Sequence, residues 1–154
     1  MKPGTFTQMY VQIVFAVKYR QAFLDKNIRD RIFSYIGGSI NGLGHKSIII
    51  NGMADHVHIL FGLNPARSIS DTVHDIKRGS SLFINENKLC ACRFAWQEGY
   101  GGFTYSHSQI DTIYNYILNQ EERHKRSSFR EEYLEFLRQS EIDFDYRFLF
   151  EFIK

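Results

Sequence analysis

The stretch that decides the fold is DHVHILF, residues 55–61, in which two histidines flank one apolar residue. Side chains alternate along a β-strand, so His56, His58 and Leu60 are expected on one face of a sheet. Two imidazoles at neighbouring positions of one face can bind a divalent metal ion, because the strand already holds both rings in place. Two ligands do not complete a site, so a third must come from elsewhere. The alternative is a pair of surface histidines on an amphipathic strand.

The segments on either side predict an α+β chain. Residues 7–18 are rich in β-branched and aromatic side chains and predict a buried strand. Further strands are predicted at 46–53, 56–63 and 103–106. Apolar residues at helical spacing, with capping and stop signals, predict helices at about 25–43, 69–87, 110–125 and 129–139. The order β-α-β-β-α-β-α predicts a ferredoxin-like (RRM-like) fold, an antiparallel sheet with helices packed on one face.

Length and composition restrict the class of protein. The 154 residues fit a single domain, 1–154, with a core at about 7–126 followed by a helix and an aromatic tail at 129–154. Hydrophobic residues make up 44% and charged residues 23% of the chain, which excludes extensive disorder. No apolar run approaches ~20 residues and the N-terminus has no signal-peptide pattern, so we expect a cytoplasmic protein without membrane partners. The net charge of +2 is too small to identify a polyanionic partner.

A second candidate constellation lies on the helix predicted from residue 110. Its apolar stripe is Ile110, Ile113, Tyr114, Ile117 and Leu118. Tyr116 and Gln120 are one turn apart and share a face away from that stripe. A tyrosine can act as a nucleophile in phosphoryl transfer, and an amide oxygen can ligate a metal ion. A tyrosine is more often a packing residue, as Tyr114 on the stripe illustrates.

The two constellations together resemble a known signature. HVH (56–58) with YILNQ (116–120) is similar to the motifs of the HUH single-tyrosine transposases of bacterial insertion sequences, the insertion-sequence-200-like family. Two intervening segments, DTVHDIK (71–77) and WQEGYGGF (96–103), also resemble that family and occur in the same order. The resemblance extends from about Tyr10 to the region of Tyr146. It departs at Met53-Ala54-Asp55, where such proteins often have Met-Pro-Asp, which affects only the stiffness of the turn.

The resemblance implies a function as well as a fold. It implies that His56, His58 and Gln120 hold a divalent ion, for which Mg²⁺ or Mn²⁺ is expected, and that Tyr116 is the nucleophile. The reaction would be cleavage and rejoining of one DNA strand through a 5′-phosphotyrosine intermediate. The implied partners are single-stranded or hairpin DNA at the ends of a mobile element and a second copy of the chain, in a homodimer whose active sites are shared between chains.

Two other functions are compatible with the same residues. One is a non-catalytic ferredoxin-like module that binds single-stranded nucleic acid by aromatic stacking. The other is a metal hydrolase in which water is the nucleophile.

Basic and aromatic residues suggest further surfaces. The candidates for DNA phosphate contacts are Lys77, Arg78, Arg123, Lys125 and Arg126. A solvated charged face is the alternative for each of them. In the tail, residues 143–154 alternate aromatic and other side chains, so an extended tail would present one aromatic face. That face would be covered by the chain's own sheet or by a partner chain.

Overall fold

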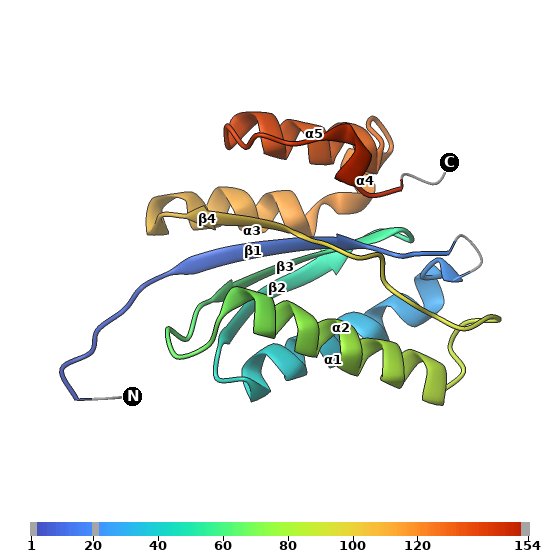
Figure 1. Ribbon diagram of the computed structural model, residues 1–154, viewed down its shortest axis with the longest axis horizontal. Coiled ribbons are helices and arrows are strands. Elements are labelled where there is room, and N and C mark those ends of the chain that lie inside the picture. The colour runs from blue at the N-terminus through green and yellow to red at the C-terminus, as the bar shows by residue number, and fades with distance from the viewer. Residues whose placement is uncertain (1–2, 20–21, 152–154) are drawn as a thin grey trace.

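Four strands form the sheet at the centre of the protein, in a computed structural model that describes residues 3–19 and 22–151. They are β1 (Tyr10–Ala16), β2 (Lys46–Gly52), β3 (His56–Gly62) and β4 (Gly101–Tyr105). Their order is β2-β3-β1-β4, and every neighbouring pair is antiparallel. The predicted ferredoxin-like, α+β fold is therefore confirmed (Figure 1).

The histidine strand lies inside the sheet. β3 pairs with β1 and β2, with Ala16 opposite His56 and Val14 opposite His58. Its residues from His56 to Phe61 are buried on both faces, which explains why this strand is apolar on the side away from the histidines. The histidines are thereby fixed on a backbone with partners on either side.

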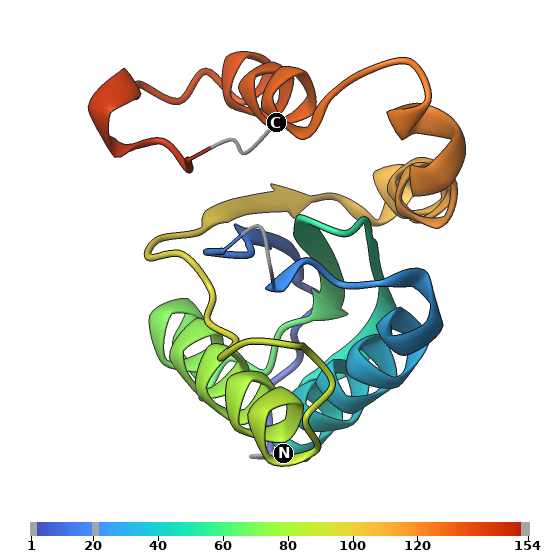
Figure 2. The same ribbon diagram turned by 90° about the vertical axis from the view of Figure 1, so that its right-hand side faces the viewer.

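Two helices cover one face of the sheet. α1 (Lys26–Gly42) and α2 (Ile69–Glu86) lie side by side there, as the views along and across the sheet show (Figures 1 and 2). The side chain of Ser68 accepts a hydrogen bond from the Asp71 amide and begins α2, as its capping sequence predicts. The core lies between these helices and the sheet.

The C-terminal helices lie on the opposite face. They are α3 (Ile110–Leu118), which follows the 3₁₀ turn η2 (His107–Gln109), α4 (Gln120–His124) and α5 (Phe129–Gln139). Figure 2 shows α5 above the sheet and α3 and α4 toward one of its edges. The single helix predicted for 110–125 is broken at Asn119, whose φ of −96° and ψ of 30° are not helical. None of the described helices is long and apolar enough to cross a lipid bilayer.

The tail is not extended along its length, so the predicted aromatic face does not form. Residues Tyr146–Phe148 make a 3₁₀ turn, η3, in which the side chain of Asp145 accepts a hydrogen bond from the Arg147 amide. Phe150 is buried with its ring centroid 5.0 Å from that of Tyr133, whereas Phe148 is 82% exposed. The turn that begins at Asp145 interrupts the extended backbone that such an aromatic face requires. Residues 152–154 lie outside the described part of the chain.

Candidate active site

The two histidines of β3 meet on the face that the C-terminal helices cover. His56 and His58 are both fully buried, and their ring centroids are 5.1 Å apart. This closeness follows from the alternation of side chains along β3. Phe129 of α5 stacks on His56 with ring centroids 4.0 Å apart and ring planes 6° apart. The histidines are therefore not surface residues of an amphipathic strand.

The tyrosine and glutamine of the α3–α4 segment reach the same place. Gln120, the first residue of α4, is fully buried, and its Oε1 lies 3.0 Å from His56 Nε2. Tyr116 lies in the last turn of α3, with its ring centroid 6.1 Å from that of His58. The side chain of Asn51 on β2 donates to the carbonyl of Ile117 at 2.9 Å, which attaches the end of α3 to the sheet. The structure thus brings His56, His58, Tyr116 and Gln120 together within one chain.

A carboxylate that the sequence analysis missed lies among them. Glu132 of α5 is 4% exposed. Its Oε1 lies 2.9 Å from His58 Nε2 and 3.2 Å from His56 Nε2. Its Oε2 accepts hydrogen bonds from the Tyr116 hydroxyl and, at 3.1 Å, from Gln120 Nε2. A signal was present in the sequence, because position 132 falls within the apolar stripe of α5, where a charged residue needs a buried partner.

A third histidine, also missed, completes the set around this carboxylate. His124 Nε2 lies 3.2 Å from Glu132 Oε2 and 3.2 Å from Gln120 Oε1. Its Nδ1 lies 2.9 Å from the carbonyl oxygen of Ser127. His124 is the fourth residue after Gln120, so one turn of α4 places both side chains on the same side.

The outer nitrogens of the two β3 histidines also have partners. His56 Nδ1 lies 2.7 Å from Asp55 Oδ1. Gln12 of β1 donates from Nε2 to His58 Nδ1 at 2.8 Å, and the Tyr105 hydroxyl donates to Gln12 Oε1 at 2.6 Å. Both histidines therefore direct Nε2 into the site, and a second residue holds each ring at Nδ1.

Burial and neighbouring charges perturb the titration of these groups. Burial lowers the pKa of His56, but the hydrogen bonds to Asp55 and Glu132 outweigh it and raise that pKa to about 9. For His58 burial dominates and lowers the pKa. Burial would raise the pKa of Glu132, yet the surrounding histidines hold it well below its usual range. Burial, together with the Glu132 carboxylate, raises the pKa of Tyr116.

The donor set fits a small divalent cation. Nε2 of both histidines, Gln120 Oε1 and Glu132 Oε1 converge, and His56, His58 and Glu132 together can offer three ligand atoms within 4.8 Å of one another. Nitrogen and oxygen donors without a thiolate suit Mn²⁺, and the two oxygens extend the fit to Mg²⁺.

The predicted DNA contacts divide into two groups. Arg123 and Arg126 line a hollow of about 570 Å³ that also includes Tyr116, and the Arg123 guanidinium lies 4.4 Å from the centre of the Tyr116 ring. Lys125 pairs with Glu122 at 2.8 Å.

The other two candidates, Lys77 and Arg78, belong to α2, on the opposite face of the sheet (Figure 1). Lys77 Nζ donates to the carbonyls of Gln97 at 2.7 Å and Gly99 at 2.6 Å, and burial lowers its pKa to about 8. Lys77 therefore holds the loop before β4 in place.

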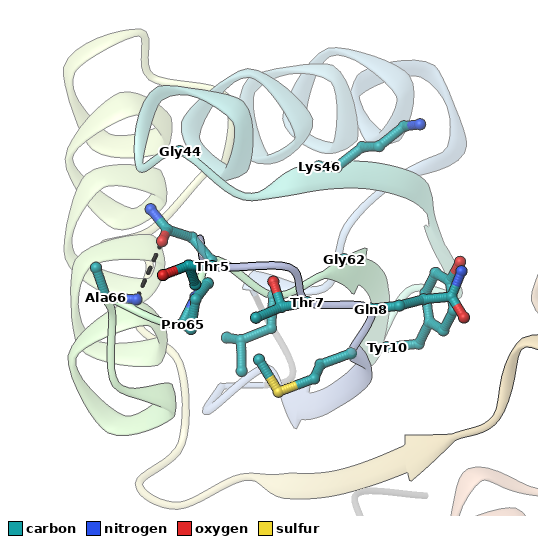
Figure 3. A pocket seen from close by; sticks show the side chains of 12 residues that line it. Thr5, Thr7, Gln8, Tyr10, Gly44, Lys46, Gly62, Pro65 and Ala66 are labelled. Carbon is teal, nitrogen blue, oxygen red and sulfur yellow. Dashed lines mark hydrogen bonds between the residues drawn. The ribbon is translucent and has the colours of Figure 1, made fainter. Parts of the chain in front are cut away.

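A larger hollow, of about 790 Å³, lies at the other end of the sheet (Figure 3). It is lined by the segment before β1, by the start of β2 and by the loop after β3, including Thr5, Gln8, Lys46 and Asn64. Since Tyr10 pairs with Gly62 at this end and Ala16 with His56 at the other, the hollow is separate from the histidine cluster.

Comparison with known proteins places this site in a family. Residues 5–120 match the family model described as Transposase IS200 like, which includes His56, His58, Tyr116 and Gln120 but ends before Glu132. The ISDra2 transposase TnpA of Deinococcus radiodurans is 26% identical over 125 residues, which cover 78% of this chain and 89% of that protein.

Two solved structures share the fold. One is a candidate transposase from Deinococcus radiodurans R1, with a TM-score of 0.60, 23% identity and coverage of 78% of this chain and 96% of that one. The other is a REP-associated tyrosine transposase bound to a REP hairpin, with a TM-score of 0.58, 12% identity and coverage of 80% and 74%. Since the family model spans well over half of the sequence and contains its histidine and tyrosine motifs, this chain belongs to the IS200-like transposases.

Proposed function

We propose that the protein is a metal-dependent transposase that cleaves and rejoins single-stranded DNA through a 5′-phosphotyrosine intermediate. The observation that carries the proposal is the meeting of the Tyr116 hydroxyl with two histidines, an amide and a carboxylate in one buried cluster. Membership in the IS200-like transposases supports the reaction class. A non-catalytic nucleic-acid-binding module would have no use for a buried cluster of this kind. We also propose that it acts in the cytoplasm, where its DNA substrate would be.

His56, His58 and Gln120 are the residues we assign to the ion, which we expect to be Mg²⁺ or Mn²⁺. When bound, such an ion polarises the scissile phosphate and stabilises the charge that develops on it. Asp55 and Gln12 hold the outer nitrogens of the histidines. Because an amide and a hydroxyl can each donate or accept, Gln12 and Tyr105 can serve either tautomer of His58.

Tyr116 supplies the nucleophile. Its oxygen would form a bond to the scissile phosphorus while the bond from phosphorus to the 3′-oxygen breaks, and the phenol proton ends on the released 3′-hydroxyl. The DNA on the 3′ side of the break is then joined to Tyr116 through its 5′-phosphate. Attack by the 3′-hydroxyl of another strand end reverses these bond changes and releases the phenol. The helix end attached to β2 through Asn51 keeps the tyrosine in place during both steps.

Trapping a covalent adduct tests this proposal. The wild-type chain, incubated with Mn²⁺ and a 3′-labelled single-stranded or hairpin oligonucleotide, should give a protein–DNA species that survives denaturation. A binding module would give no adduct and no cleavage. A metal hydrolase would give cleaved DNA without an adduct, since water would take the place of the tyrosine.

Metal binding should strengthen as the pH rises. The pKa of His56 is about 9, so over the neutral range a proton on this residue competes with the ion. The apparent affinity for Mn²⁺ should therefore rise by up to about tenfold per pH unit below that pKa. The free Mn²⁺ signal in electron paramagnetic resonance measures this directly. An affinity that stays flat across the neutral range would mean that His56 does not have to lose a proton.

Arg126 should contribute to DNA binding, because it shares the hollow beside Tyr116. Arg126→Gln is expected to weaken binding of single-stranded DNA and to reduce the slope of log affinity against log salt by about 0.7, the loss of one phosphate contact. Arg78→Gln is the matched control, because Arg78 lies on α2, on the other face of the sheet. Equal effects of both changes would show that the hollow beside Tyr116 does not contact the DNA.

The homodimer with shared sites can be tested by complementation. The histidines precede β4, whereas Tyr116, Gln120 and Glu132 follow it, so two chains that exchange their C-terminal helices would reproduce the same contacts between chains. In a mixture of His56→Ala and Tyr116→Phe chains, shared sites would restore about a quarter of the wild-type cleavage after random pairing. No recovery from heterodimers isolated with two affinity tags would mean that each site is built within one chain.

A further inference from the structure

The carboxylate of Glu132 lies at the centre of the cluster, outside the residues matched by the family model. It is the only buried carboxylate in the part of the chain that the structure describes. A buried carboxylate without partners would be strongly destabilising, so its position requires that both of its oxygens be used. The two oxygens have different partners, and this difference indicates what the residue does.

Glu132 Oε1 lies where a ligand would be expected. It is 2.9 Å from His58 Nε2 and 3.2 Å from His56 Nε2, and Gln120 Oε1 is 3.0 Å from His56 Nε2. Neighbouring ligands of an octahedral ion with bonds of about 2.1 Å are about 3 Å apart, so these spacings fit one shared ion. A carboxylate oxygen would also give the site a negative charge that two imidazoles and an amide lack.

Glu132 Oε2 lies where it can hold the nucleophile. It accepts the hydrogen bond from the Tyr116 hydroxyl, and Gln120 Nε2 and His124 Nε2 contact the same oxygen at 3.1 and 3.2 Å. One rigid carboxylate group therefore connects the Tyr116 hydroxyl with the two histidines.

Aromatic packing fixes the carboxylate from both sides. Phe129 and Phe136, on the same side of α5 as Glu132, pack on His56 and against the Tyr116 ring, with centroid separations of 4.0 and 5.4 Å. Ser128 begins the helix by accepting a hydrogen bond from the Glu131 amide. The side chain of Glu132 thus has little freedom to leave the cluster while α5 stays in place.

We propose that Glu132 is a metal ligand and a positioning residue, with Oε1 bound to the same ion as His56 and His58 and Oε2 holding the Tyr116 hydroxyl beside it. The inference rests on the proposed function and extends the site to α5. Glu132 would set the distance between nucleophile and ion and would favour Mg²⁺ and Mn²⁺, which prefer carboxylate oxygens.

Titration of the full chain with Mn²⁺, in the absence of DNA, tests the ligand assignment. Glu132→Gln has nearly the same shape and should weaken Mn²⁺ binding by about tenfold or more. Glu131→Gln is the matched control, because it removes the same charge from an exposed position one residue away and should leave the affinity within about twofold. Circular dichroism and thermal unfolding establish that both variants are folded.

A kinetic measurement tests the positioning role. Glu132→Gln should lower kcat for adduct formation at saturating Mn²⁺ while the KM for the oligonucleotide stays close to the wild-type value. Equal Mn²⁺ affinities of wild type and Glu132→Gln would overturn the ligand assignment alone. Faster cleavage by Glu132→Gln would also overturn the inference, because the carboxylate would then be blocking the site. A wild-type chain that binds no Mn²⁺ would instead overturn the metal part of the proposed function.

Discussion

Tyr116→Phe is expected to eliminate the covalent protein–DNA adduct and to reduce strand cleavage by on the order of 10⁴-fold or more. The change removes the hydroxyl and nothing else, so the phosphorus loses its nucleophile while the ring keeps its contacts with Arg123 and Phe136. Binding of the oligonucleotide should stay near the wild-type level. Denaturing gel electrophoresis measures the adduct, and a filter-binding titration measures the affinity.

The control for this change is Tyr114→Phe. Tyr114 is two residues away on α3 and 38% exposed, and it lies on another side of the helix. The Tyr114→Phe variant should form the adduct at the wild-type rate. An adduct that persists in Tyr116→Phe and disappears in Tyr114→Phe would assign the nucleophile to the other ring. Loss of the adduct in both variants, with their folds intact, would indicate that the surface of α3 is required and that no single hydroxyl is the nucleophile.

Much of the fold could be predicted because local patterns carried the information. Alternation in residues 55–61 predicts which face of β3 carries the histidines, and the structure places both rings together on one face. The helix-start signal at Ser68 corresponds to an observed cap. The antiparallel pairing of β2 with β3 followed from the short connection at residues 53–55, and the antiparallel sheet followed from the order of elements along the chain.

The break at Asn119 could not be predicted from periodicity. The stripe that ends at Leu118 continues into a polar segment that is compatible with one helix, and Asn119 is not a strong helix breaker. What decides the break is tertiary contact, since Asn51 of β2 binds the carbonyls of Ile117 and Leu118. Beyond the break, Gln120 and His124 both lie beside His56, with Gln120 Oε1 3.0 Å from His56 Nε2 and the two imidazole ring centroids 4.8 Å apart.

Glu132 could not be assigned from the sequence for a related reason. Its place on the apolar side of α5 can be read from the spacing of Phe129 and Phe136, but not the surface that this side covers. That surface is the face of the sheet that carries the two histidines. The predicted fold placed helices on one face of the sheet and did not say what covers the other face. The two buried imidazoles and the buried carboxylate form hydrogen bonds with one another, although His58 and Glu132 are 74 residues apart in the sequence. No local sequence pattern describes a contact over such a separation.

His56→Ala is expected to weaken Mn²⁺ binding by at least about 100-fold and to abolish adduct formation at any Mn²⁺ concentration that the protein tolerates. The variant removes one of the two imidazole donors. It also removes the imidazole that contacts Asp55 and Glu132 and whose proton competes with the ion, so any remaining metal binding should depend less on pH. Isothermal titration calorimetry with Mn²⁺ measures the first effect, and the oligonucleotide assay measures the second.

The matched control for this variant is His74→Ala. His74 is exposed on α2, where its Nδ1 lies 3.4 Å from Asp75, and it is on the opposite face of the sheet from the cluster. The His74→Ala variant should bind Mn²⁺ and cleave DNA as the wild type does. Because His56→Ala also removes the ring on which Phe129 stacks, its thermal unfolding must be measured beside its activity. A folded His56→Ala chain that cleaves DNA at the wild-type rate after chelation of all divalent ions would show that the tyrosine acts without a metal.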